Sequence, residues 1–171
     1  DELGALILKR LEEHGAAEGM ILSDQEKTSY SVVLAIPGID RIFLHDPGAN
    51  VTFSGSDLDF EAIKGADLFH FGYPTLMRRM YQNQGEELAR MFRRIKEGGT
   101  AISLDMAAID PSSEAAGEDW KGILEKVLPY VDFFVPSAEE LCFMLDRERY
   151  QEWTKRAEGR DITAVSYTHL R

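Results

Sequence analysis

The sequence has little of what marks a membrane-bound or nucleic-acid-binding protein. It has no apolar run of 18 residues and no charged-then-apolar leader, so we expect no membrane partner. Its 19 basic residues are outnumbered by 30 acidic ones, for a net charge of -11. A nucleic-acid backbone or an anionic membrane attracts basic patches, so we expect no nucleic-acid partner either. A single cysteine, Cys142, excludes an internal disulfide and favours a cytoplasmic location.

Several motifs that identify an enzyme class are also absent. The sequence contains no CxxC pair, no HExxH, no Walker-type GxxxxGK and no GxSxG elbow. Its 171 residues are enough for one domain with a sizeable core. By motif alone, the chain is an α/β domain of unassigned function.

The most informative stretch runs from residue 98 to residue 145. Two short apolar runs, 100–104 and 131–135, flank a segment whose apolar residues recur at helical spacing between Trp120 and Leu128. Strand, helix and strand in that order, with both strands apolar throughout, indicate a parallel sheet covered on both faces.

The remaining segments extend the same design. Residues 3–11 form an apolar stripe typical of an amphipathic helix packed on a sheet, and 28–36 with 41–45 predict a β-hairpin. A strand over 66–71 precedes a helix that ends at Gly98. Five arginines near this helix are interpreted as a solvated face: Arg78, Arg79, Arg90, Arg93 and Arg94. A helix over 147–157 and a strand over 161–165 complete a three-layer α/β domain with a hairpin appendage.

Polar residues follow the two central strands, where ligands bind in parallel sheets. Asp105 ends the first strand, and either capping of the next segment or a functional role would explain a carboxylate there. Ser137 and Glu140 have the spacing of a helix capping box, which explains both residues structurally. The functional alternative is that Glu140 orders a water or Mg²⁺ near a phosphate.

Taken in order, these segments resemble the middle of a ribokinase-like (PfkB-type) carbohydrate kinase. TSYSVVLAIPGIDRIFL (28–44) resembles the family's lid-type hairpin, and GADLFHFGYP (65–74) resembles the strand that leads to its substrate pocket. SLDM (103–106) resembles the strand that ends in the family's "DxN" segment, and VDFFVPSAEEL (131–141) resembles its "PNxxE" element. The helix at 1–15 resembles the one that follows the family's substrate-binding glycines.

The resemblance implies an enzyme that transfers the γ-phosphate of ATP to a hydroxymethyl group of a sugar or related small molecule. It implies that Ser137, Glu140 and Asp105 contact the ATP side of the site, that Glu140 acts on Mg²⁺, and that Tyr73 and Asn50 contact the sugar. Ser137 replaces the usual asparagine, and Ala107 stands where asparagine is common in "DxN". Family members also suggest a homodimer. The alternative is a non-catalytic homologue that binds a ligand or partner.

The resemblance also implies that the sequence is a central fragment of the family's domain. The family's substrate-binding glycines are expected before Asp1, and its "GAGD" element, with the catalytic aspartate, beyond Arg171. No catalytic base is therefore assigned here, and the fragment alone is expected to be inactive. We assign residues 1–165 to the partial kinase domain and interpret 166–171 as a non-native tail. Residues 165–170, VSYTHL, match the translation of the sequencing adapter GTCTCTTATACACATCT, although their β propensity also permits a genuine strand.

Overall fold

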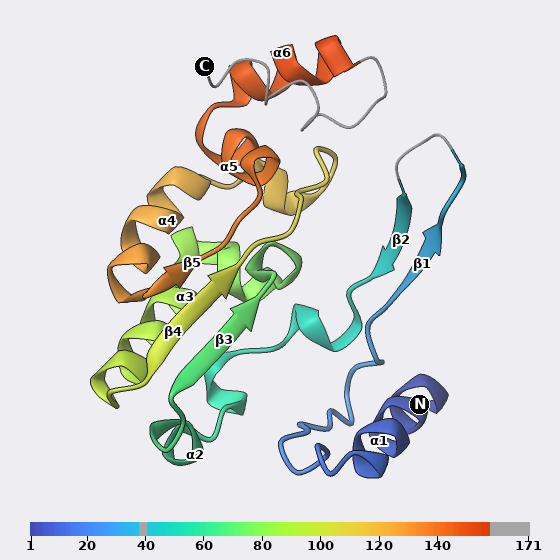
Figure 1. The fold of residues 1–171 in the computed structure, drawn as a ribbon, viewed down its shortest axis with the longest axis vertical. Coiled ribbons are helices and arrows are strands. Elements are labelled where there is room, and N and C mark those ends of the chain that lie inside the picture. The colour runs from blue at the N-terminus through green and yellow to red at the C-terminus, as the bar shows by residue number, and fades with distance from the viewer. Residues whose placement is uncertain (38–40, 158–171) are drawn as a thin grey trace.

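A three-stranded parallel sheet forms the centre of the fold (Figure 1). The computed structural model describes residues 1–37 and 41–157. The strands are β3 (Leu68–Gly72), β4 (Ala101–Asp105) and β5 (Phe133–Phe134), in the spatial order β3-β4-β5. The predicted parallel α/β arrangement is therefore confirmed.

Two helices connect the strands and cover one face of this sheet. Helix α3 (Arg78–Glu97) links β3 to β4, and α4 (Trp120–Val127) with the 3-10 turn η5 (Leu128–Tyr130) links β4 to β5. Apolar residues from these helices and from the covered face of the strands form the core. Its fully buried side chains include Met80, Leu88, Phe92, Ile95, Ile102, Leu104, Trp120, Ile123 and Val127.

Among residues 1–37 and 41–157, helices cover one face of the sheet, and the second face carries exposed apolar residues. Leu68 is 48% exposed and Phe133 is 57% exposed on this face. Both connections step along the sheet in the same direction, and right-handed crossovers then place α3 and α4 on the same side. Within residues 1–37 and 41–157, no helix layer covers the second face (Figure 1).

Strand β5 is shorter than the predicted run 131–135, and Asp132, directly before it, bonds to β4 with both its backbone and its side chain. Its backbone N–H donates to the Ile102 carbonyl at 2.9 Å, and its carboxylate accepts the Ile102 N–H at 2.8 Å. Lys96 also donates to this carboxylate, at 2.6 Å. Asp132 therefore fixes the start of β5 against β4.

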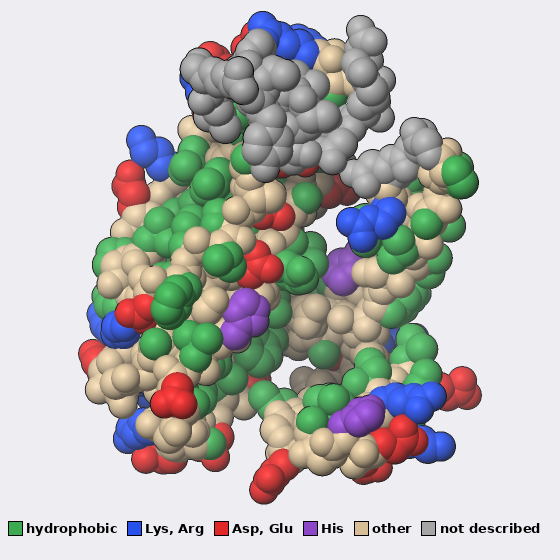
Figure 2. Space-filling view, viewed as in Figure 1, with side chains coloured by type: hydrophobic (Ala, Val, Ile, Leu, Met, Phe, Trp, Pro, Cys, Tyr) green, Lys and Arg blue, Asp and Glu red, His purple; other side chains and the backbone are tan. Residues whose placement is uncertain are grey.

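The hairpin is confirmed as an antiparallel pair of β1 (Tyr30–Leu34) and β2 (Ile42–Asp46). All ten of its strand residues are exposed. Residues 38–40 of its turn lie outside the described residues. Figure 2 shows hydrophobic side chains along the hairpin, and a hollow between it and the rest of the molecule.

Helix α1 (Glu2–Glu13) forms as predicted but does not pack on the sheet. None of its residues is buried, and Figure 1 shows it beside the base of the hairpin, away from the three-stranded sheet. Asp1 caps the helix by accepting the Gly4 N–H at 2.8 Å, and its second carboxylate oxygen accepts the Thr28 N–H at 2.7 Å. This capping aspartate thus links α1 to the segment that enters β1.

Short elements complete the described chain. They are η1 (Gly48–Val51), η2 (Gly55–Asp57), α2 (Phe60–Lys64), η3 (Pro74–Leu76), η4 (Glu114–Gly117), α5 (Ala138–Leu145) and α6 (Arg147–Ala157). The predicted strand at 161–165 and the interpreted tail at 166–171 lie outside the described residues. In the part of the chain that the structure describes, no helix is both long enough and apolar enough to cross a membrane.

Candidate functional site

The carboxyl ends of β3, β4 and β5 meet at one edge of the sheet. Gly72 pairs with Asp105, Leu104 pairs with Phe134, and the Val135 N–H extends the ladder by donating to the Leu104 carbonyl at 3.0 Å. The parallel register thereby brings Asp105 and the segment that begins α5 to the same edge. This is the juxtaposition that the sequence predicted from the strand–helix–strand order.

Asp105 is half-buried at the end of β4 and keeps one carboxylate oxygen available. Its Oδ1 accepts the N–H of the next residue, Met106, at 2.8 Å. Among residues 1–37 and 41–157, no donor contacts the second oxygen. The bond to Met106 fixes the orientation of the carboxylate, and its open oxygen can accept a hydrogen bond from a ligand or a water.

Tyr73 lies beside Asp105, where β3 ends. Its backbone N–H donates to the Asp105 carbonyl at 3.1 Å, and its conformation is left-handed (φ 64°, ψ 46°). A tyrosine adopts this conformation at some cost, and Pro74 follows it at the first position of η3. The left-handed turn ends the strand, and Tyr73 is 48% exposed at the sheet edge.

Thr75 braces this edge, and the sequence analysis missed it. Thr75 is only 3% exposed, and its hydroxyl donates to the Ala107 carbonyl at 3.2 Å. The bond ties the segment after β3 to the segment after β4. No sequence pattern identifies such a contact, because the two residues are 32 positions apart and meet only when the strands pair.

Ser137 and Glu140 form the predicted capping box at the start of α5. The Ser137 Oγ accepts the Glu140 N–H at 3.2 Å, and Glu140 Oε2 accepts the Ser137 N–H at 2.7 Å. The structural explanation of the pair is thus confirmed. The box engages Oε2 of Glu140, and within the described residues no donor contacts Oε1, which can accept a hydrogen bond from a ligand or a water.

Asn50 lies elsewhere, in η1 at the base of the hairpin. Its side chain is half-buried, and its Nδ2 donates to Ser29 Oγ at 3.2 Å. The bond connects the segment after β2 to the segment before β1. The role of Asn50 toward a sugar remains a prediction that depends on how the hairpin faces the sheet edge.

The donors at the edge fit Mg²⁺ only in part. Within the described residues there is no cluster of three or more His, Cys, Asp or Glu side chains that could hold a metal. Magnesium commonly keeps several waters and binds one or two carboxylates together with substrate phosphates. Asp105 and Glu140 could supply such carboxylates, directly or through water, but they do not form a metal site without the phosphates.

Solved structures of known proteins share the fold that forms this edge. The chain superposes on a PfkB protein from Polaromonas sp. JS666 with a TM-score of 0.65, 16% identity, and coverage of 84% of this chain and 49% of that one. It superposes on the fructokinase with bound ATP from Xylella fastidiosa with a TM-score of 0.60 and 21% identity, covering 96% and 47%. The chain has the ribokinase-like fold.

The sequence comparisons agree with this fold. The chain is 27% identical over 154 residues to the probable fructokinase-6, chloroplastic, of Arabidopsis thaliana, a match that covers 86% of this chain and 38% of that protein. No protein-family model matches. The resemblance to PfkB-type carbohydrate kinases is thus confirmed, and the chain spans less than half the length of the curated relatives it matches.

Proposed function

We propose that the full-length protein is an ATP-dependent sugar kinase that transfers the γ-phosphate to a hydroxymethyl group of its acceptor. The observation that carries this proposal is the convergence of Asp105, Tyr73 and the Ser137–Glu140 box on one edge of the sheet. The likeness of this chain to a fructokinase whose structure holds ATP supports nucleotide binding at this edge. Because the curated relatives are named fructokinases, fructose is the first acceptor to test.

Each side chain at the edge has a chemically suitable role in this proposal. The free oxygen of Asp105 and the open Oε1 of Glu140 would hold waters around Mg²⁺ and the phosphates, while the cap keeps Glu140 in place. Bound Mg²⁺ neutralises phosphate charge and orients the nucleotide. The exposed ring of Tyr73 would pack against the acceptor, and Asn50 would reach it from the hairpin side.

The test is an ADP-release assay on the full-length protein with fructose and a panel of other sugars. We expect sugar-dependent turnover that requires Mg²⁺ and that Asp105→Asn lowers by at least about tenfold, since positioning supplies most of the rate in phosphoryl transfer. Glu125→Gln, on the exposed side of α4, is the matched control and should leave turnover unchanged. Binding of ATP without turnover on any sugar would contradict the proposal and favour a non-catalytic homologue.

A homodimer is part of the proposal, because the hairpin offers an apolar face that nothing in the described chain covers. Val32, Leu34, Ile42 and Leu44 share one face by register, and each is at least 42% exposed. An isolated two-stranded hairpin is marginally stable in water, so a second copy that covers this face would stabilise it. We also propose a cytoplasmic location, in keeping with the free and buried thiol of Cys142.

A further inference from the structure

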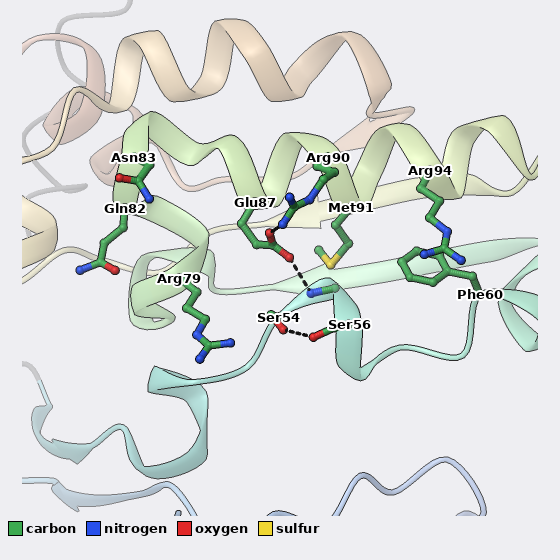
Figure 3. A pocket seen from close by; sticks show the side chains of 11 residues that line it. Ser54, Ser56, Phe60, Arg79, Gln82, Asn83, Glu87, Arg90, Met91 and Arg94 are labelled. Atoms are coloured by element: carbon green, nitrogen blue, oxygen red, sulfur yellow. Dashed lines mark hydrogen bonds and ion pairs between the residues drawn. The ribbon is translucent and has the colours of Figure 1, made fainter.

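Three arginines of α3 share a cavity, although the sequence favours a solvated face for them. The cavity has a volume of about 580 Å³ and lies between α3, η2 and the start of α2 (Figure 3). Arg79, Arg90 and Arg94 line it, with Ser54 and Ser56 opposite them. None of the residues assigned to the sheet edge lines this cavity.

The three arginines are held in different ways, and within the described part of the chain one of them pairs with a carboxylate. Arg94 stacks on the ring of Phe60, with its guanidinium carbon 3.8 Å from the ring centroid, while Arg90 pairs with Glu87. Within residues 1–37 and 41–157, neither Arg79 nor Arg94 has an ion-pair partner. Their N–H donors are therefore available to a ligand.

The cavity is electropositive in a protein that is strongly acidic. Its lining contains three arginines and one glutamate, a net charge of +2 (three minus one), whereas the whole chain carries -11. Glu87 is engaged on both oxygens, with Arg90 and with the Gly55 N–H at 2.9 Å. Asp57 lies next to the lining, but its Oδ2 is occupied by the Ser54 N–H at 2.7 Å.

Two serine hydroxyls, already hydrogen-bonded to each other and to Asp57, form part of the opposite wall. Ser54 is 5% exposed, and its Oγ lies 2.7 Å from the Oγ of Ser56 and 3.2 Å from Asp57 Oδ2. Figure 3 shows the Arg79 guanidinium extending toward the two serines. Guanidinium groups bind phosphate oxygens through paired N–H donors.

We propose that this cavity is a binding site for a phosphate group, separate from the sheet edge. Its volume lies in the range of small-molecule pockets and exceeds what inorganic phosphate alone would fill, which favours a small phosphorylated metabolite. Arg79 and Arg94 supply the charge-assisted hydrogen bonds, and Ser56 faces them from η2. The site is independent of the proposed kinase activity, since its residues do not contact the edge.

The test is calorimetric titration of the purified protein with inorganic phosphate and, separately, with glucose 6-phosphate. We expect saturable binding, and Arg79→Gln and Arg94→Gln should each raise Kd by about tenfold or more, as expected for loss of a charge-assisted bond. Arg93→Gln is the matched control, because Arg93 is an exposed arginine of the same helix outside the cavity. It should change Kd by less than about twofold.

Three results would overturn the proposal. They are the absence of saturable binding up to about 10 mM ligand, an equal weakening by Arg93→Gln and Arg79→Gln, and loss of binding when ATP saturates the protein. Tighter binding of glucose 6-phosphate would assign the site to a phosphate ester, and equal binding would assign it to free phosphate; either supports the site. Because binding is measured without turnover, failure here is distinguishable from failure of the kinase assignment.

Discussion

The backbone N–H of Tyr73 donates a 3.1 Å hydrogen bond to the carbonyl oxygen of Asp105. Asp105 ends β4 and Tyr73 directly follows β3, and the whole of α3 separates the two residues along the chain. This bond continues the β3–β4 ladder by one residue and sets the exposed tyrosine beside the half-buried carboxylate. The account of function depends on this edge, and the predictions below test its parts.

Substitutions of Ser137 and Glu140 should distinguish a capping role of Glu140 from a catalytic one. Each residue supplies one side of the capping box, so Ser137→Ala and Glu140→Ala should each lower the free energy of unfolding by about 1 kcal/mol. Only Glu140→Ala also removes a carboxylate from the proposed nucleotide edge. We expect its turnover to fall by at least about tenfold, with an altered Mg²⁺ dependence. Urea unfolding and ADP release on both variants measure this, and an equal loss of turnover would leave Glu140 with a structural role alone.

Gly85→Ala should destabilise the protein by about 1–3 kcal/mol, because an alanine there is both strained and crowded. Gly85 has φ 71° at the kink in α3, and a Cβ would lie 2.7 Å from Ile123 Cγ2 on α4. Gly117→Ala is the control, since a Cβ there meets nothing within 4 Å. Urea denaturation of both variants measures the difference, and equal stability of the two variants would contradict the prediction.

The titration of Asp132 should make the free energy of unfolding depend on pH in the acid range. The hydrogen bond from Lys96, followed by that from the Ile102 N–H, holds the pKa of this carboxyl below its usual value. A lowered pKa adds stability above the unfolded value of about 3.9, and this is lost as the pH falls through the folded pKa. Over that acid range Asp132→Asn should therefore show a shallower dependence of unfolding free energy on pH than the wild type.

Lys96→Met provides a second arm, because it removes the largest cause of the shift and keeps the carboxylate. Its pH dependence should lie between those of the wild type and Asp132→Asn. Urea titrations at a series of pH values measure all three proteins. Identical slopes would show that the Lys96 contact does not affect the titration of Asp132.

Leu44→Lys should weaken the proposed dimer. Leu44 is 57% exposed on the apolar face of the hairpin, so a charge there would be costly to bury against a second copy. Sedimentation equilibrium should show a dimer for the full-length wild type and a weaker dimer for the variant. The control is Ser31→Lys, which lies on the other face of β1 by register. A monomeric wild type, or equal effects of the two substitutions, would contradict an interface on this face.

Local patterns in the sequence were enough to predict the order of strands and helices, the hairpin and the capping box at Ser137. Each depends on residues close together in the chain: the alternation in β1, the helical spacing after Trp120, and the serine–glutamate pair. The exposed apolar residues on the second face of the sheet were not predicted, because a buried and an exposed apolar strand have the same composition. Leu68 and Phe133 read as core residues, yet both are exposed.

The arginine cavity could not be predicted for a related reason. In sequence, these arginines share the helix with Glu86, Glu87 and Glu97, and such a mixture of charges is typical of a solvated helix face. The concavity arises only when η2 packs against α3 and brings Ser54 opposite them. Thr75 was missed in the same way, since its partner Ala107 becomes a neighbour only through strand pairing.

Hydrogen–deuterium exchange on the full-length protein, with and without ATP and Mg²⁺, tests the central claim most directly. If the carboxyl edge of the sheet binds the nucleotide, backbone amides at 105–108 and 135–141 should exchange more slowly when ATP is bound, because ligand binding suppresses local opening. Amides of α6 serve as the internal reference and should be unaffected. Protection at the sheet edge is the predicted result. Saturating ATP that leaves both edge segments unprotected would contradict the account.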